Sequence, residues 1–353
     1  MRIVEAEFWR TDFVLREPYT IAYETYDAAT NFFVRIRADD GHEGFGCAAP
    51  APDVTRETIP ACEAALELLC AKLEGGADDP AASARTATPA AAAAIDMAQH
   101  DLHARTLGVP VYTMLGGEHG ALPTSITIGI NDLEETRVQG KRHADEGFRA
   151  IKVKGGHDPE LDAERMLALR ADLGDGIELR FDANEGYDPE DAAVFLDASR
   201  SAGITVFEQP TRRDDPAALT AVRLSLESLP APRPALLADE DAVSVHDVAS
   251  LAAAGQVDGV VVKLMKCGGI AAAQEIDTIA AGAGMRNMVS CMDESALAIA
   301  AGLHYALAAR QNSWIDLDGH LDLLDDPAGQ AIRLRGGRLE PVSDHGFGVG
   351  LRR

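Results

Sequence analysis

Apolar residues in the larger part of the chain gather into short runs that are separated by longer stretches with helical spacing. From about Pro123 onward, each run reads as a buried strand, and helical stretches such as Pro159 to Leu173, Pro189 to Ala202 and Gly269 to Ala283 lie between the runs. Eight strands with seven crossovers favour a barrel over a doubly wound sheet. The predicted strands are Thr124 to Ile130, Ala150 to Lys154, Glu178 to Asp182, Thr205 to Glu208, Ala235 to Asp239, Gly259 to Lys263, Asn287 to Cys291 and Ser313 to Asp316.

The first hundred or so residues follow a different pattern. Ile3 to Phe13 and Asn31 to Arg37 are typical of strands, and Asp40-Gly41 marks a hairpin into Glu43 to Gly46. Helices are predicted from about Thr55 to Glu74 and from Pro89 to Leu107. We therefore expect an α+β domain over residues 1–120, a barrel over 121–330, and a Gly-rich segment, 331–353, that returns to the first domain.

Composition and charge narrow the function. The chain has 353 residues and a formal net charge of −25, which opposes binding to nucleic acid or to anionic membranes. Apolar runs fall short of a membrane span, and charged residues at the start oppose a signal peptide, so we expect a cytoplasmic protein. The five cysteines are odd in number and form no C-x-x-C pair, which argues against disulfides and thiolate metal sites. The predicted partners are a small-molecule substrate and further copies of the same chain.

Three carboxylates follow successive predicted strands at their carboxyl ends. Asp182, Glu208 and Asp239 each close a short apolar run, about one strand-helix unit apart. In a parallel barrel these ends open onto one face, so the three acids would converge there. Hard oxygen ligands favour Mg²⁺ or Mn²⁺ over softer metals. The alternative is that the acids are separate helix caps or loop residues, but their regular recurrence favours a site for Mg²⁺.

Two further strand ends supply lysines. Lys152 and Lys154 lie two apart on one strand and therefore share a face. Lys263 ends the sixth strand, roughly across the barrel mouth. A lysine near a divalent cation and another ammonium is expected to have a lowered pKa, which would make it a usable base. The alternative is a set of exposed or snorkelling lysines.

Taken together, these residues resemble the enolase superfamily, and within it the muconate-lactonizing subgroup. Its members carry K-x-K on the second strand, metal acids on the third, fourth and fifth, and lysine on the sixth. The resemblance covers nearly the whole chain and implies a modified (β/α)₇β TIM-type barrel with an N-terminal α+β capping domain, whose mobile substrate loop would lie near residues 15–30.

The resemblance also implies roles for the residues. Asp182, Glu208 and Asp239 would bind Mg²⁺. Lys154 and Lys263 would be the acid/base catalysts and Lys152 would hold the substrate carboxylate, with Asn184 and Glu240 next to the metal ligands. The implied chemistry is removal of an α-proton beside a carboxylate to form an ene-diolate, followed by protonation from the opposite side.

Residues at the eighth strand resemble one branch of this subgroup, the dipeptide epimerases. Asp316 and Asp318 form a D-x-D that in those enzymes captures the N-terminal ammonium of a dipeptide. Epimerases for Ala-Glu carry an arginine where the best alignment places Glu24, and an acid cannot bind a glutamate side chain. Together with Asp27 and Asp293, next to the family glutamate Glu294, this predicts a substrate with a basic or neutral side chain.

Other functions remain open at this point. The same chemistry would serve a racemase, epimerase or dehydratase of another cationic α-amino carboxylate, such as a proline derivative with Asp316, Asp318 or Trp314 facing its nitrogen. An N-acylamino acid racemase or a cycloisomerase of the subgroup is a further alternative, as is a barrel without activity. A metal-dependent hydrolase is disfavoured because the ten histidines do not occupy the strand ends.

Overall fold

Eight parallel strands form the centre of the computed structural model, which describes all residues except 1, 23–24, 76–87, 343 and 352–353. The strands are β5 (Ser125–Ile128), β6 (Ala150–Lys154), β7 (Glu178–Asp182), β8 (Val206–Glu208), β9 (Ala235–Ala238), β10 (Gly259–Lys263), β11 (Arg286–Ser290) and β12 (Asn312–Asp316). Neighbours in the sequence are neighbours in the sheet, from β5 to β12. The barrel almost closes, because Ser125 Oγ donates a hydrogen bond to the Ile315 carbonyl oxygen at 3.2 Å. The predicted barrel is confirmed.

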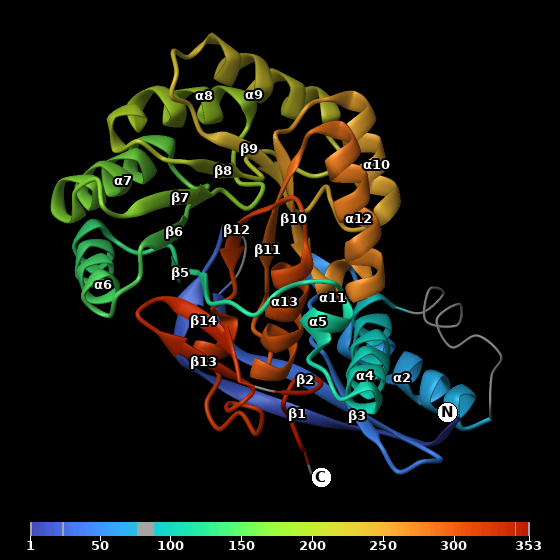
Figure 1. Ribbon diagram of the computed structural model, residues 1–353. Coiled ribbons are helices and arrows are strands. Elements are labelled where there is room, and N and C mark those ends of the chain that lie inside the picture. Colours follow the sequence, from blue (N-terminus) through green and yellow to red (C-terminus); the bar gives the residue numbers. More distant parts are fainter. Residues whose placement is uncertain (1, 23–24, 76–87, 343, 352–353) are drawn as a thin grey trace.

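Helices cover the outside of this barrel (Figure 1). Several begin at an aspartate whose side chain accepts a hydrogen bond from the first helical turn, as at Asp132, Asp158, Asp188 and Asp215. Some of the aspartates that make the chain so negatively charged therefore cap helices. The helices are α6 (Leu133–Asp145), α7 (Pro159–Leu173), α8 (Pro189–Ala198), α9 (Pro216–Ser228), α10 (Val245–Ala254), α11 (Leu264–Cys267), α12 (Ile270–Ala283) and α13 (Ala296–Ala308). The helix predicted from Pro189 to Ala202 ends at Ala198 and continues as a short 3₁₀ turn over Arg200–Ala202.

The capping unit pairs an antiparallel sheet with helices. Its strands are β1 (Ile3–Thr20), β2 (Thr25–Ala38) and β3 (Glu43–Ala48), and its helices are α1 (Pro52–Thr55), α2 (Ile59–Glu74), α4 (Pro89–Leu107) and α5 (Val111–Met114). Strand β3 lies so close to α4 that a Cβ atom on Gly46 would meet the Ala94 carbonyl oxygen at 1.9 Å. The prediction of one helix from Thr55 to Glu74 is wrong at its start, because the structure has a short helix up to Thr55 and a second one from Ile59. Arg56 adopts a left-handed conformation (φ 59°), which ends α1 and separates it from α2.

Most of the segment 15–30 is strand rather than loop. Strand β1 continues to Thr20 and β2 starts at Thr25, with an irregular ladder between Val14 and Tyr19. The extended antiparallel pairing explains the difference from the predicted loop. Glu24 lies outside the described residues.

The closing segment runs back to the capping unit. Strands β13 (Ile332–Arg335) and β14 (Arg338–Pro341) form a small sheet with β4 (Leu122–Pro123). Beyond them, the Phe347 amide donates a hydrogen bond to Asp101 Oδ1 of α4 at 2.7 Å. The domain limits 120/121 and 330/331 stay an interpretation.

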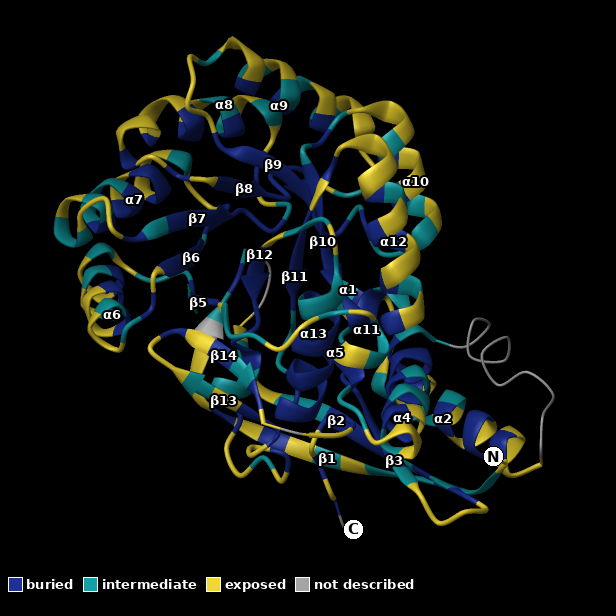
Figure 2. Cartoon of the chain, in the orientation of Figure 1, coloured by how far each residue is buried: buried dark blue, intermediate teal, exposed yellow. Residues whose placement is uncertain are grey.

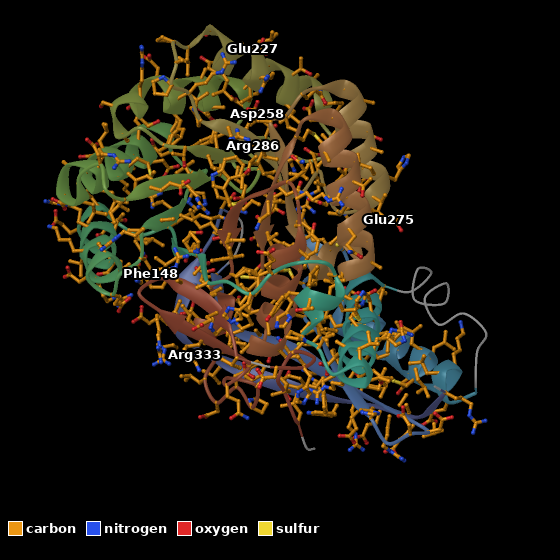
Figure 3. All side chains as sticks on the ribbon, in the orientation of Figure 1. Phe148, Glu227, Asp258, Glu275, Arg286 and Arg333 are labelled. Atoms are coloured by element: carbon orange, nitrogen blue, oxygen red, sulfur yellow. The ribbon has the colours of Figure 1, made fainter. Side chains whose placement is uncertain are left out.

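Burial joins the two units into one body. A single apolar cluster extends from the capping sheet through α4 and α13 into the layer between strands and helices. Helix α13 has 11 of its 13 residues buried because it lies between the capping unit and the barrel. Figure 2 shows the barrel strands largely buried and the outer helix faces exposed. On those faces, charged side chains such as Glu227 and Glu275 point to solvent (Figure 3). Among the described helices, none has the length and apolarity that crossing a membrane requires.

Candidate active site

Strand register places the predicted site residues side by side at the carboxyl end of the barrel. Lys154, Asp182 and Glu208 occupy matching positions on β6, β7 and β8. Lys263 and Asp316 flank Ser290 in the same way across β10, β11 and β12. Because parallel strands in register end at one rim, side chains that are far apart in the sequence meet there.

A buried lysine forms the centre of this rim. Lys152 Nζ lies 2.9 Å from Glu208 Oε1, 3.1 Å from Asp182 Oδ2 and 3.0 Å from Asp316 Oδ2. The side chain is only 2% exposed. Burial lowers the pKa of Lys152, but the surrounding carboxylates, led by Asp316, outweigh it and raise that pKa well above its usual range. Lys152 is therefore a fixed positive charge among the acids.

The two lysines predicted as catalysts each pair with a different acid. Lys154 Nζ donates to Asp182 Oδ2 and Lys263 Nζ donates to Asp239 Oδ2, both at 2.7 Å. Strands β6 and β10 are the second and sixth of eight, so the two lysines approach from opposite sides of the barrel. Burial lowers the pKa of Lys263, but Asp239 outweighs it and raises that pKa. The lowered pKa predicted for Lys263 presupposes a divalent cation on the neighbouring acids, which would weaken the pairing of Lys263 with Asp239, so it stays a prediction.

The three acids predicted as metal ligands fit a hard divalent cation. Asp182, Glu208 and Asp239 are each at most 1% exposed. Glu208 Oε2 has no hydrogen-bond partner in the described part of the chain, although Lys152 Nζ lies 2.9 Å from it. Carboxylate oxygens are the ligands that Mg²⁺ prefers. Among the described residues, no three Asp, Glu, His or Cys side chains lie in an arrangement that would hold a metal ion, and the Lys152 ammonium lies 2.9 Å from Glu208 Oε1 and 3.1 Å from Asp182 Oδ2.

Asn184 and Glu240 connect the loops behind these acids. The backbone N–H of Asn184 donates a hydrogen bond to Asp182 Oδ1 at 2.9 Å, and the side-chain nitrogen of Asn184 donates one to Glu240 Oε1 at 3.2 Å. Asn184 has a φ of 41°, a conformation that Asn adopts more readily than most residues. Burial raises the pKa of Glu240 to about 7, with a further contribution from the Asp239 carboxylate. Asn184 thus links Asp182 to Glu240, the residue that follows Asp239.

Two supporting residues were missed from the sequence. Lys266 Nζ donates to Asp239 Oδ1 and, at 2.6 Å, to the Asp239 carbonyl oxygen. Gln209 Oε1 accepts a hydrogen bond from the Asp239 amide at 2.9 Å. Asp239 is thus held at both ends of its backbone and through its side chain. No local sequence signal marks Lys266, because its contact with Asp239 depends on the one-turn helix α11 that directly follows β10.

Two adjoining cavities, of about 360 and 90 Å³, open at the rim. Lys154, Lys263 and Asp293 line both cavities, together with Cys291 and Met292. The rest of the larger wall comes mainly from small and apolar residues of the capping unit. These are Ile21, Tyr26, Ala28, Ala29, Thr30, Ala49, Pro50, Ala51, Pro52, Val54 and Ile59.

The predicted specificity residues are only partly brought together. Asp293 lines both cavities, whereas Asp27 is exposed and lines neither of them. Glu294 is buried behind the wall at 3% exposure, and burial raises its pKa to about 8.

The two acids of the D-x-D have different surroundings. Asp316 Oδ1 accepts a hydrogen bond from Ser125 Oγ at 2.6 Å, and Asp316 Oδ2 accepts one from Ser290 Oγ at 2.8 Å and pairs with Lys152. Asp318 Oδ2 accepts one from the Thr127 amide at 2.7 Å. Burial and the Asp316 carboxylate raise the pKa of Asp318 to about 7. Both acids line the smaller cavity, but Asp316 is largely occupied by the protein itself.

Trp314 lies far from this site. Its ring packs in a small cluster inside the barrel with Val206, Ala235, Leu237, Val261 and Met288. The Arg286 guanidinium stacks over the Trp314 ring at 4.4 Å from its centroid. The suggestion that Trp314 faces a substrate nitrogen is wrong, because its side chain points toward the amino end of the strands.

Comparison with known proteins agrees with this geometry. Residues 4–116 match the family model "Mandelate racemase / muconate lactonizing enzyme, N-terminal domain", and residues 135–353 match "Enolase C-terminal domain-like". An L-Lys-D/L-Arg epimerase of Desulforapulum autotrophicum is 38% identical over 99% of both chains.

Two solved structures extend the likeness to three dimensions. The dipeptide epimerase of Methylococcus capsulatus, complexed with Mg and L-Arg-D-Lys, is 37% identical with a TM-score of 0.87 over 99% of both chains. The substrate-liganded L-Ala-D/L-Glu epimerase of Bacillus subtilis is 30% identical with a TM-score of 0.92, over 99% of this chain and 98% of that one. The chain therefore belongs to the mandelate racemase and muconate lactonizing enzyme family of the enolase superfamily.

Proposed function

We propose that the protein is a Mg²⁺-dependent dipeptide epimerase that inverts the α-carbon of the C-terminal residue. The observation that carries this proposal is the position of Lys154 and Lys263. They come from opposite strands of the barrel, yet both line the same two cavities. A planar intermediate held between two such groups can lose a proton to one face and gain one from the other.

The side chains of this protein divide the work. Mg²⁺ bound by Asp182, Glu208 and Asp239 would supply positive charge that stabilises the carboxylate end of the substrate as its α-proton leaves. Lys152 adds a fixed positive charge beside it. Either Lys154 or Lys263, as the neutral amine, removes the α-proton, and the other, as the ammonium, returns a proton to the opposite face.

The two cavities suggest how a dipeptide lies. Asp318 lines the smaller cavity, where its carboxylate can pair with the ammonium of the N-terminal residue. The C-terminal side chain then extends into the larger cavity, whose apolar wall suits a methylene chain. Asp293 at the junction supports a preference for lysine or arginine. The names of the relatives from Desulforapulum and Methylococcus support the same substrate class.

Deuterium exchange tests the proposal directly. The enzyme with Mg²⁺ in D₂O should add one deuterium to the C-terminal residue of L-Ala-L-Arg and L-Ala-L-Lys, faster than to L-Ala-L-Glu. N-acetylated L-Ala-L-Arg is the matched control, because it lacks the ammonium that Asp318 would bind. A faster reaction of the acetylated compound would favour an N-acylamino acid racemase, and exchange confined to proline derivatives would favour another amino carboxylate.

Lysine variants test the division of labour. Lys154→Ala and Lys263→Ala should each abolish interconversion of the L,L and L,D forms, while exchange survives with the one epimer whose α-proton faces the remaining lysine. Lys141→Ala removes a half-exposed surface lysine and should behave as the wild type. Full turnover by either active-site variant would overturn the two-base assignment.

A further inference from the structure

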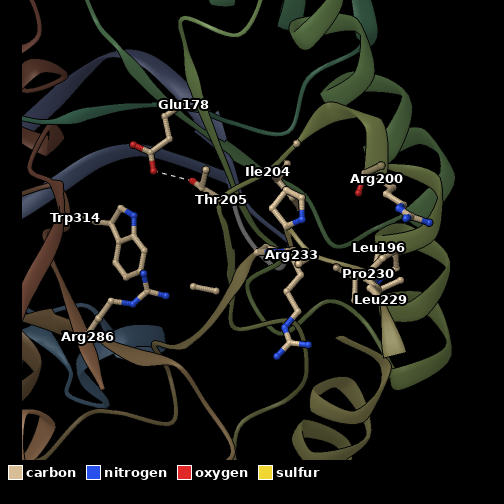
Figure 4. A pocket seen from close by; sticks show the side chains of 16 residues that line it. Glu178, Leu196, Arg200, Ile204, Thr205, Leu229, Pro230, Arg233, Arg286 and Trp314 are labelled. Carbon is tan, nitrogen blue, oxygen red and sulfur yellow. Dashed lines mark hydrogen bonds between the residues drawn. The ribbon is translucent and has the colours of Figure 1, made fainter. Parts of the chain in front are cut away.

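A third cavity, of about 550 Å³, lies at the opposite end of the barrel. Figure 4 shows side chains that line it. Its wall includes the first residues of three strands, Glu178 of β7, Ala235 of β9 and Arg286 of β11. The carboxyl ends of the same strands form the candidate active site. Nothing in the proposed reaction uses this end of the barrel.

The charge of this cavity is opposite to that of the protein. Arg200, Arg233 and Arg286 line it in a chain whose formal net charge is −25. Within the part of the chain that the structure describes, the side chains of Arg200 and Arg233 make no hydrogen bond or ion pair. The one acid in the wall, Glu178, already pairs with Arg180 at 3.0 Å and accepts a hydrogen bond from Thr205 Oγ1 at 2.7 Å. The guanidinium groups therefore present uncompensated positive charge.

Much of the remaining wall is apolar, and one of its loops is stiffened by prolines. Leu196, Ile204 and Leu229 contribute aliphatic surface, and Trp314 contributes a ring over which Arg286 is stacked at 4.4 Å. Prolines at positions 230, 232 and 234 flank Arg233. Since each proline fixes its own φ, the loop that presents Arg233 has little freedom to lose when a ligand binds.

We propose that this cavity is a second binding site, for a small organic anion with a phosphate or carboxylate group and a flat or apolar body. Guanidinium groups match both kinds of anion through paired N–H donors. The volume lies within the usual range for small-molecule sites, which is roughly 300 to 1,000 Å³. The apolar surface beside the arginines takes the body of the ligand. The proposal is independent of the dipeptide epimerase reaction.

Fluorescence of Trp314 gives a direct readout. The chain has two tryptophans, Trp9 and Trp314, so a Trp9→Phe variant reports on the cavity alone. AMP, phthalate and inorganic phosphate serve as probes. Comparing AMP with phthalate tests whether the site prefers a phosphate or a carboxylate, and comparing AMP with inorganic phosphate tests whether a ring is needed. Saturable quenching by AMP or phthalate, with weaker binding of inorganic phosphate, is the expected result. No saturation by any of the three probes up to millimolar concentration would overturn the proposal.

Arginine variants in the Trp9→Phe chain locate the binding. We expect the affinity for the probe to fall about tenfold in each of the variants Arg200→Gln, Arg233→Gln and Arg286→Gln, because each loses a charge-assisted hydrogen bond. Arg335→Gln, an exposed arginine of β13, makes the same change in net charge and should leave the affinity unchanged. The proposed site would be wrong if Arg335→Gln lowered the probe affinity as much as the cavity variants do, or if none of the three cavity variants lowered it.

The mass of the protein in solution separates a small ligand from a protein partner. Sedimentation of the wild type and Arg233→Gln should give the same mass. If the wild type is a larger assembly that Arg233→Gln dissociates, the cavity receives a segment of a second copy, and the small-anion proposal is wrong.

Discussion

The ammonium of Lys152 lies 3.0 Å from Asp316 Oδ2, which joins the second strand of the barrel to the eighth. The same lysine contacts Asp182 and Glu208. Asp316 is therefore an internal partner of the acid cluster, whereas Asp318, two residues later, contacts the protein mainly through the Thr127 amide. The D-x-D thus combines one residue that holds the site together with one whose carboxylate is less engaged by the protein.

Variants of the two aspartates should separate these roles. Asp316→Asn leaves Lys152 without one of its three carboxylates and should lower the free energy of unfolding by about 3 kcal/mol, as is usual for a broken buried ion pair. Asp318→Asn keeps an acceptor for the Thr127 amide, so stability should hold while KM for a dipeptide rises about tenfold. Urea unfolding and steady-state kinetics measure both. A stable Asp316→Asn variant with raised KM alone would contradict the internal role.

Magnesium should stabilise the folded protein in a concentration-dependent way. A ligand that binds only the folded state adds about 2.7 kcal/mol at one hundred times its Kd. Thermal unfolding of the wild type should therefore shift upward with added Mg²⁺, and EDTA should reverse the shift and abolish exchange. Glu208→Gln should lose most of the shift. Asp325→Asn is a suitable control. Asp325 lines neither of the two active-site cavities, and Asn tolerates its φ of 59°.

Side-chain preference should depend on Asp293. Asp293→Asn removes the negative charge at the junction of the two cavities, so kcat/KM for L-Ala-L-Arg should fall about tenfold relative to L-Ala-L-Leu. Asp27→Asn removes an equal charge from an exposed position of β2 and should leave the ratio unchanged. An unaltered ratio in Asp293→Asn would remove Asp293 from the recognition of basic side chains.

His304 should make the protein less stable as the pH falls. Burial lowers the pKa of His304 to about 3, and its Nδ1 atom accepts a hydrogen bond from the Tyr112 amide at 3.1 Å. The folded state keeps this imidazole neutral while the unfolded state takes up a proton near pH 6.5. Above that pH, His304 does not lower the free energy of unfolding. Below it, the free energy of unfolding decreases by about 1.4 kcal/mol per pH unit, until the folded-state pKa is reached.

The variant His304→Asn keeps an acceptor for the Tyr112 amide but cannot take up the proton. Between pH 6.5 and 5, its stability should depend on pH less steeply than that of the wild type, by the equivalent of one proton. Urea unfolding at several pH values measures the two slopes. Parallel curves would show that His304 is protonated in the folded protein. The constant cost of the smaller side chain does not affect this comparison, because it is the same at every pH.

Much of this molecule could be predicted from local sequence. The strand that ends in Lys152-Val153-Lys154 and the helix Pro159–Leu173 have the predicted bounds, because hydrophobic spacing and an Asp cap specify them over a few residues. Asp182 and Lys263 could be placed at one rim for a similar reason. Once parallel strands are in register, their ends must lie together.

Contacts that depend on how loops fold back could not be predicted in this way. Lys266 reaches the Asp239 carbonyl oxygen only because the one-turn helix α11 follows β10 directly. Gly319 lies so near the loop after β11 that a Cβ atom would meet the Met292 carbonyl oxygen at 1.9 Å, although the two are 27 positions apart. Such approaches are set by the packing of whole elements.

The sequence by itself determined the barrel, the order of its strands and the chemical groups at its carboxyl rim, since short-range periodicity and parallel topology are enough to define them. Only the tertiary structure decided which oxygen each ammonium contacts, that Asp316 pairs with Lys152 while Asp318 contacts the Thr127 amide, and that Trp314 lies at the opposite end with three arginines. These relationships depend on distances of a few ångströms between residues far apart in the chain. Hydrogen bonds and ion pairs weaken steeply over such distances, so the packed fold and not the local pattern selects the partners.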